Sequence, residues 1–284
     1  MTRIADLLDA GRTMSFEFFP PKTPEAERAL EDAMAGLAPL EPSFVSVTYG
    51  ALGSTVDRTR DVVIRLNQEH PFPAMSHLTC SGHRRDQLVA LLEDYKRAGV
   101  ENVLALAGDP PADGSAVESD YTYAIELVEL IHEVNGFSVG VAAHPEVHPR
   151  STERALDRQH LADKLAVADF AVTQFFFDAA DYLAMVDELA AIGCTKPIIP
   201  GVMPIASVPG VRRMAAMNHA AIPDWLQERM DSVEGDAEAV RKLGVEVATE
   251  LCQTLLDAGV PGLHLYALNR ANSIQEIYAN LGLT

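Results

Sequence analysis

Short apolar segments alternate along the whole chain with longer segments of helical periodicity. The short segments are almost continuously apolar, which is typical of parallel strands buried on both faces. Gly and Pro mark most of the junctions between the two kinds of segment. The pattern predicts eight strands, over Met14–Phe19, Phe44–Tyr49, Ala74–Cys80, Asn102–Ala107, Ser138–Ala143, Phe170–Phe177, Pro197–Met203 and Gly262–Leu268.

The segments between these strands place apolar residues on one helical face. The clearest of them are Thr23–Ala38, Arg84–Ala98, Tyr121–Val134 and Ala237–Ala258. Eight strand–helix units in 284 residues amount to roughly 35 residues each, the size of a βα repeat. The pattern therefore predicts an α/β fold, a (β/α)8 TIM barrel with one domain over residues 1–284. Residues 1–13 should lead in with a helix, and residues 222–236 should be an irregular insertion before the last long helix.

A doubly wound sheet would show the same alternation of strands and helices. However, no Gly-x-Gly-x-x-Gly motif follows the first strand, and the sequence contains no P-loop. We therefore favour the barrel, in which active sites lie at the carboxyl ends of the strands.

Net charge, hydropathy and cysteine content limit which kinds of partner and which cell compartment are expected. The formal net charge of −19 disfavours nucleic-acid binding but says little about small anionic ligands, which respond to the local field. No stretch is apolar enough to cross a membrane. Cys80, Cys194 and Cys252 form no Cys-x-x-Cys pair, which indicates reduced, mostly buried thiols in a cytoplasmic protein. A homo-oligomer stays open, because helix faces that build a barrel resemble those that build an interface.

Polar residues interrupt or directly follow seven of the predicted strands. Because these strand ends meet at one mouth of a barrel, the residues are candidates for a shared site. They are Glu17, Thr48, His77, Asp109, His144, Gln174 and the pair Asn269-Arg270.

Glu17 lies between Phe16 and Phe18 in the first strand. Strand alternation directs the two aromatic rings toward the helices and the carboxylate toward the barrel interior. There the carboxylate should lose solvation and its pKa should rise, which makes it a candidate general acid. The alternative is an interior ion pair with a cation such as Arg270.

Asp109 and Gln174 are the other two candidate catalytic residues. Asp109 follows Gly108 and precedes two prolines, so an ionised carboxylate in a stiff loop could stabilise a cationic intermediate. A turn-capping role is the alternative. Gln174 is an amide inside an aromatic strand, where it could pair with the edge of a heterocycle or make a structural hydrogen bond.

The fifth loop and the helix after it concentrate titratable side chains. A cationic face there would suit a phosphate or pyrophosphate. Zinc is the competing idea, but neither a His-Glu-x-x-His motif nor a Cys/His quartet is present, so no metal is expected. The residues are His144, His148, Asp157, His160 and Lys164.

Taken in order, these segments resemble the bacterial type of methylenetetrahydrofolate reductase from about Met14 to Gly282. Each segment is short, but their order and spacing are specific. They are Phe16–Pro21, Val45–Gly50, His77–Cys80, Gly108–Pro110, Pro145–Pro149, Thr173–Asp178, Ile199–Gly201 and Leu268–Ala271.

The resemblance implies a (β/α)8 barrel that reduces 5,10-methylenetetrahydrofolate to 5-methyltetrahydrofolate with NADH or NADPH, usually through bound FAD. It implies that Glu17 is the acid that opens the five-membered ring to a 5-iminium cation. Asp109 would stabilise that cation, Gln174 would hydrogen-bond the folate, and Arg270 would lie near the folate tail. Thr48, His77, Tyr123, Ala124, His148, Asp157, His160 and Lys164 match positions that line the flavin or nicotinamide site.

The chain departs from the family pattern mainly around the flavin. Relatives usually have Arg before the Gly-Asp pair, where this chain has Ala107 next to Gly108, and Tyr at the position of His144. An often aromatic or Leu position in the substrate site is Met214, and an often Gln position is Gly210. Losing an Arg removes up to five donors and a fixed positive charge, so FAD should bind weakly or not at all. Hydride transfer through FAD and transfer directly from the nicotinamide both remain open.

Two other functions fit a pterin-binding barrel. A lyase or methyltransferase would need a nucleophile, a Schiff-base Lys or a corrinoid partner, and no Lys lies inside a predicted strand. A non-catalytic folate or nucleotide sensor would have no need of both Glu17 and Asp109. The sequence therefore favours the reductase.

Overall fold

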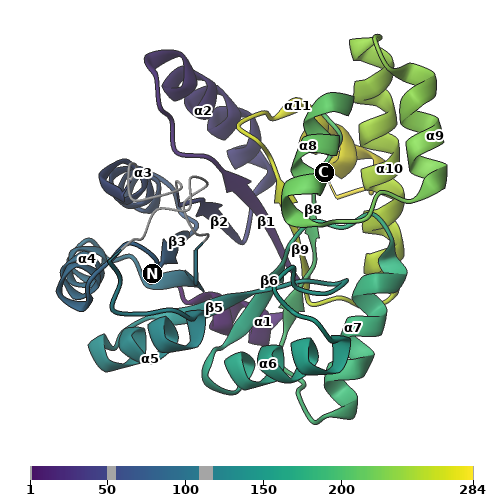
Figure 1. Ribbon diagram of the computed structural model, residues 1–284. Coiled ribbons are helices and arrows are strands. Elements are labelled where there is room, and N and C mark those ends of the chain that lie inside the picture. Colours follow the sequence, from purple (N-terminus) through teal and green to yellow (C-terminus); the bar gives the residue numbers. More distant parts are fainter. Residues whose placement is uncertain (1, 50–55, 109–117, 284) are drawn as a thin grey trace.

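One parallel sheet forms the centre of the molecule (Figure 1). The computed structural model describes residues 2–49, 56–108 and 118–283. The sheet order is β7-β6-β5-β4-β3-β2-β1-β9-β8, so β1 pairs with both β2 and the last strand, β9. The strands are β1 Thr13–Phe18, β2 Phe44–Val47, β3 Ala74–Thr79, β4 Asn102–Leu106, β5 Ser138–Ala143, β6 Phe170–Thr173, β7 Ile198–Ile199, β8 Gly201–Val202 and β9 Gly262–Tyr266.

The seventh predicted strand is divided at Pro200. Its first half, β7, pairs with β6, and its second half, β8, pairs with β9. Proline has no N–H for a ladder, but the Pro200 carbonyl still accepts from the His264 amide at 3.0 Å. At Gly201 a Cβ would lie 2.4 Å from the Thr173 carbonyl oxygen, so only glycine fits. These two short strands bridge the sheet edges into a nearly closed barrel, which confirms the predicted fold class.

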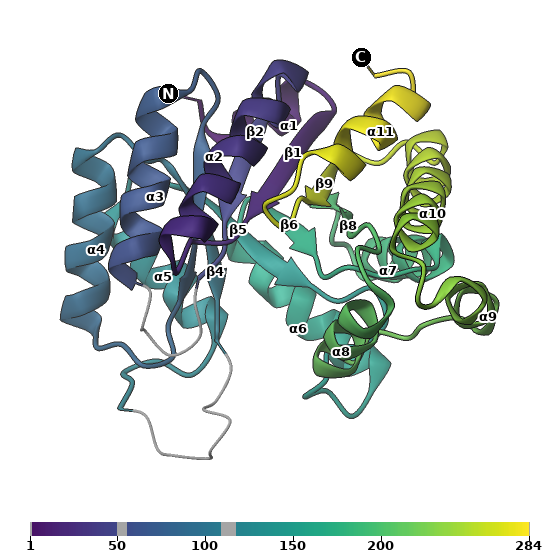
Figure 2. The ribbon, with the colours of Figure 1, turned by 90° about the horizontal axis from the view of Figure 1, so that it is seen from above.

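Helices surround the strands (Figures 1 and 2). Thr23 caps the first long helix and Asp236 the longest, as short polar side chains do at helix starts. The helices are α1 Ile4–Ala10, α2 Pro24–Leu37, the 3-10 turn η1 Ala38–Leu40, α3 Val56–Glu69, α4 Arg85–Arg97, α5 Ala124–Val134, α6 Arg154–Val167, α7 Ala179–Ala191, α8 Val208–Asn218, α9 Asp224–Val233, α10 Ala237–Asp257 and α11 Asn272–Asn280.

The prediction of irregular chain over residues 222–236 is wrong, because α9 lies there. Leu226 and Met230 are one helical turn apart and are completely buried. They pack in one apolar cluster with residues of α8 and α10, such as Val211 and Leu243. A short helix with only two buried residues has a weak periodic signal, and this tertiary packing stabilises it.

Apolar residues form one layer between strands and helices and another inside the barrel. Phe16 and Phe18 belong to the outer layer, where the Phe16 ring lies 5.5 Å from Tyr278 of α11. The inner cluster includes Phe44, Leu104 and Phe170 and is closed by Ile4 of α1. The predicted alternation along β1 is therefore confirmed, with the phenyl rings outward and the residue between them inward.

Helix α1 closes the amino-terminal end of the barrel, on the side away from α8 in Figure 2. Its first amides have no partner within the helix. Ile4 N donates to Asn102 Oδ1 at 2.7 Å, and Ala5 N donates to Ser138 Oγ at 3.2 Å. Side chains at the starts of β4 and β5 thus cap the predicted lead-in helix.

Among the residues described, no helix is long and apolar enough to cross a membrane.

Asn102→Ala should lower the free energy of unfolding by about 1–3 kcal/mol, because it leaves the buried Ile4 amide without an acceptor. Urea unfolding followed by circular dichroism measures the change. Asn280→Ala, at the exposed end of α11, serves as the control and should change it by less than about 0.5 kcal/mol. Equal effects of the two substitutions would show that Asn102 does not anchor α1.

Candidate active site

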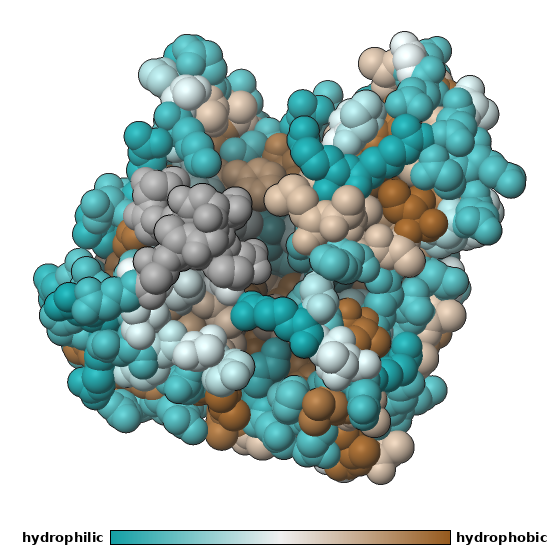
Figure 3. All heavy atoms as spheres, viewed as in Figure 1, coloured by the Kyte–Doolittle hydropathy of each residue, from teal (hydrophilic) through white to brown (hydrophobic). Residues whose placement is uncertain are grey.

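A cavity of about 240 Å³ opens at the carboxyl ends of the strands. The space-filling view shows the corresponding face hollowed near its centre (Figure 3). Active sites of barrel enzymes lie at this end. Six of the residues singled out in the sequence line it: Glu17, Thr48, His77, His144, Gln174 and Met214.

Glu17 lies on β1 with its carboxylate in the barrel interior, where its residue is 7% exposed. Its Oε2 atom accepts from Ser46 Oγ at 3.4 Å and lies 3.2 Å from His264 Nε2. His77 Nε2 is 3.3 Å away, at ion-pair distance but without hydrogen-bond geometry. Strands β2, β3 and β9 therefore each place a polar side chain against the same carboxylate oxygen.

The hydrogen bonds of His264 indicate where its protons lie. Ser15 Oγ donates to the Leu263 carbonyl at 3.1 Å and lies 2.8 Å from His264 Nδ1. Because the single Ser15 proton is used in the first contact, Nδ1–H is the donor in the second. Nε2 then faces Glu17 Oε2 and, also at 3.2 Å, Ser46 Oγ.

The expectation that the Glu17 pKa is raised is wrong. Burial by itself raises this pKa, but the charge of His77 and the hydrogen bond and charge of His264 outweigh burial and lower it from 4.5 to about 2. The alternative partner Arg270 is also wrong, because Arg270 is exposed and the cations facing Glu17 are histidines.

Gln174 follows β6 with both ends of its amide fixed. Nε2 donates to Asn218 Oδ1 at 2.9 Å, and Oε1 accepts from the Phe175 amide at 2.9 Å. Asn218 Nδ2 in turn donates to the Met214 carbonyl at 2.9 Å. Each Gln174 atom keeps one further hydrogen or lone pair for a ligand. Asn218 also lines the cavity and was not anticipated from the sequence.

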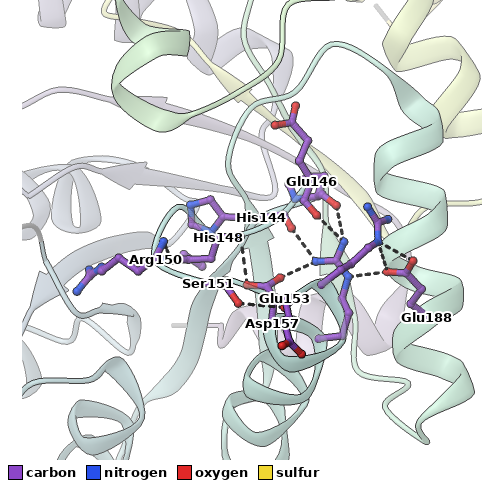
Figure 4. A network of polar contacts seen from close by, with 12 residues as sticks. His144, Glu146, His148, Arg150, Ser151, Glu153, Asp157 and Glu188 are labelled. Carbon is purple, nitrogen blue, oxygen red and sulfur yellow. Dashed lines mark hydrogen bonds and ion pairs between the residues drawn. The ribbon is translucent and has the colours of Figure 1, made fainter.

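The loop between β5 and α6 carries His144 and His148, whose ring centres lie 4.5 Å apart (Figure 4). Burial and the neighbouring positive groups lower the pKa of His144 to about 3. Asp157 Oδ1 accepts from the His148 amide at 3.1 Å. Lys164 Nζ donates to the Ala142 carbonyl at 2.8 Å, and burial lowers its pKa to about 8. His160 is exposed, whereas Asp157 is buried and Lys164 is partly buried.

The remaining predicted positions lie around the end of β4. Ala107 places no polar side-chain atom there, and its carbonyl accepts from the Ser81 amide at 3.0 Å. Gly108 has φ +85°, and its carbonyl accepts from Arg150 Nη2 at 3.1 Å. Tyr123 is 65% exposed and precedes Ala124, the first residue of α5. Asp109 lies outside the described residues, as do the prolines after it.

Nothing in the described part of the chain groups three or more His, Cys, Asp or Glu residues in a way that could hold a metal ion. Cys80, Cys194 and Cys252 are free thiols, two of them buried, as predicted. Taken together, the cavity offers the Glu17 carboxylate with its histidine neighbours, the fixed Gln174 amide and apolar walls.

Comparison with known proteins identifies the chain. The methylenetetrahydrofolate reductase family profile matches residues 3–282. The 5,10-methylenetetrahydrofolate reductases of Salmonella typhimurium and Escherichia coli are 38% and 37% identical over 271 residues, covering 95% of this chain and 90% of each enzyme. The maize protein named methylenetetrahydrofolate reductase (NADH) 1 is 37% identical over 297 residues, which cover 99% of this chain and half of that protein.

Solved structures share the fold at low identity. A Clostridium thermocellum protein, described as binding two copies of 5-methyl-5,6,7,8-tetrahydrofolic acid, matches with a TM-score of 0.69 and 14% identity. The alignment covers 98% of this chain and 97% of that one. The profile match over almost the whole length, together with relatives near 37% identity, shows that the chain belongs to the methylenetetrahydrofolate reductase family.

Proposed function

We propose that this protein reduces 5,10-methylenetetrahydrofolate to 5-methyltetrahydrofolate with NADH, and that hydride passes directly from the nicotinamide. The observation that carries the proposal is the buried Glu17 carboxylate, held by two histidines in the same cavity as the Gln174 amide. Family membership supports the reaction, and the NADH named for the plant relatives supports the donor.

The pterin would lie against Gln174. This amide can donate to and accept from a heterocycle edge, and Asn218 keeps it from rotating. Met214 and Phe175 supply apolar wall on the same side of the cavity. Arg270, exposed after β9, would pair with the carboxylates of the folate tail.

Glu17 would supply the proton that opens the five-membered ring. A charged pair of Glu17 and His264 and a neutral pair differ only in the position of one shared proton. When a substrate displaces water, the neutral pair is favoured, so the proton moves onto the carboxylate. It then passes to the ring nitrogen whose bond to the methylene carbon breaks. The product of that step is a 5-iminium cation, which a carboxylate at Asp109 would stabilise electrostatically.

The hydride from NADH would add to the exocyclic iminium carbon, which gives the methyl group and NAD⁺. We assign the nicotinamide to the side of the cavity formed by Thr48, His77 and His144, with His148 next to it. Ala107, Gly108, Tyr123 and Ala124 would lie along the rest of the dinucleotide.

The residues present do not fit FAD well. Ala107 supplies no side-chain donor. Asp157 contacts Arg158 and the His148 amide, and Lys164 bonds to the Ala142 carbonyl, so two of the expected flavin contacts are used within the protein. The iminium cation is a strong electrophile, so hydride transfer does not require a flavin intermediate.

Replacement of the acid tests the reaction. Glu17→Gln should lower kcat for NADH oxidation in the presence of methylenetetrahydrofolate by at least about 10²-fold, because the amide cannot donate an acidic proton. The dissociation constants of NADH and of the folate should stay within about threefold. Glu250→Gln, on the exposed face of α10, is the control. Wild-type turnover in Glu17→Gln would remove Glu17 from the mechanism.

The lowered pKa of Glu17 makes a separate prediction about stability. A carboxyl whose pKa is lower in the folded state than in the unfolded chain stabilises the fold while it is ionised. This contribution is complete above pH 4.5 and is lost as the pH falls through about 2. The wild type should therefore lose stability relative to Glu17→Gln when urea unfolding is repeated from about pH 6 down to about pH 3. A constant difference over that range would mean that the histidines do not keep Glu17 ionised.

The absorption spectrum tests the direct route. The purified protein should be colourless after incubation with FAD and gel filtration, yet should oxidise NADH when the folate is present. A retained flavin spectrum that NADH bleaches and methylenetetrahydrofolate restores would contradict direct transfer and establish a flavin intermediate.

A further inference from the structure

Arg158 on α6 is a buried cation, and among the described residues its hydrogen bonds go to Asp157, Glu188 and backbone carbonyls rather than to a cavity-lining side chain. Its side chain is 3% exposed. The guanidinium has five N–H donors, and five acceptors surround it within 3.2 Å. Nε donates to Glu188, Nη1 to the Asp157 carboxylate and the His144 carbonyl, and Nη2 to the carbonyls of Pro145 and Glu146.

Three of these acceptors are consecutive carbonyls at the beginning of the β5–α6 loop, residues 144–146. The next turn of the loop is held by the neighbouring residue, since Asp157 Oδ1 accepts from the His148 amide while its Oδ2 accepts from Arg158. Figure 4 shows Asp157 and Glu188 on neighbouring helices beside the loop that carries His144, Glu146 and His148. One buried pair on α6 therefore fixes the path of the loop from residue 144 to residue 148.

The fixed loop faces the cavity. His144 lines the cavity, and the His148 ring packs edge-on against His144. The His148 Nδ1 atom accepts from the Arg150 amide at 3.1 Å, which leaves the proton of a neutral ring on Nε2. The loop thus presents two imidazoles whose positions depend on backbone that Arg158 holds.

We propose that Arg158 is a positioning residue for dinucleotide binding: it holds the β5–α6 loop so that His144 and His148 form the wall against which NADH binds. The inference rests on the proposed function for the identity of the dinucleotide. Arg158 itself touches no ligand. It acts through backbone carbonyls, for which a planar five-donor group is suited and a lysine is not.

Arg154 provides a matched control. It lies one helical turn before Arg158 on α6 and bonds the same Glu188 carboxylate, with Nε at 2.7 and 3.0 Å from the two oxygens. Its side chain is 43% exposed, and no loop carbonyl is among the acceptors found for it in the described structure. Arg154→Lys therefore changes the same ion-pair network without loosening the loop.

The test is direct titration of NADH and, separately, of 5-methyltetrahydrofolate into purified wild type, Arg158→Lys and Arg154→Lys. Arg158→Lys keeps the positive charge but offers three donors from a single nitrogen. We expect it to raise the NADH dissociation constant about tenfold and to leave the folate constant within about twofold. Arg154→Lys should leave both constants within about twofold. An unchanged NADH constant in Arg158→Lys, or an equal rise in both constants, overturns the proposal, since a general loss of structure would weaken both ligands.

If Arg158→Lys does not fold, Glu188→Gln gives the same information. It keeps the shape of the Arg158 partner and removes one charge, so NADH binding should weaken by a smaller factor and folate binding should not change. An unchanged NADH constant there overturns the proposal. Because binding is measured without turnover, failure of the proposed reaction and failure of the proposed role of Arg158 give different results. Wild type that binds NADH in an Arg158-dependent way but never reduces the folate would refute the proposed reaction and keep the role of Arg158.

Discussion

The pairing of β1 with β9 is the constraint on which the rest of the structure depends. It joins segments about 250 residues apart in the chain and places His264 next to Glu17. Closure through β7 and β8 completes the ring, because β9 then has a neighbour on each side. The Glu17 carboxylate inside this ring is only 7% exposed, so its pKa is set mainly by the side chains that neighbouring strands place beside it. The chemistry of the cavity therefore follows from strand order.

Two sequence patterns account for what could be predicted. The continuous apolar segments located all eight strand positions, and alternation within the first strand directed Glu17 inward between Phe16 and Phe18. The same alternation applied to Gly262–Leu268 would have found His264, which stands between two leucines in β9. The direction of the Glu17 pKa could not be found this way, because it depends on which side chains face the carboxylate across the barrel. Helix α9 and the break at Pro200 were missed for a related reason, since both depend on contacts with residues outside their own segments.

Positive charge near the cavity contrasts with the strongly acidic chain. Arg158 is buried and Lys164 is partly buried on α6; Arg158 is bonded to carbonyls of the β5–α6 loop and Lys164 to the Ala142 carbonyl just before it. Buried cations are tolerated when they are paired and hydrogen-bonded, as Arg158 is by Asp157 and Glu188. They also disfavour protonation of His144. A neutral imidazole at this wall would suit the proposed reaction, because an imidazolium would repel both the proposed iminium cation and an oxidised nicotinamide.

A lowered Glu17 pKa and a role for Glu17 as acid are compatible. The pKa of about 2 reflects the charge of His77 and the hydrogen bond and charge of His264, which outweigh burial and favour the ionised Glu17 carboxylate. Ser15 accepts from the opposite nitrogen of His264, so Nε2 is the nitrogen that faces Glu17 Oε2 and, also at 3.2 Å, Ser46 Oγ. A bound pterin would exclude water and weaken the charged form of the pair relative to the neutral one. On the proposed mechanism, the barrel would store the proton in an ion pair and release it to the carboxyl when the site is filled.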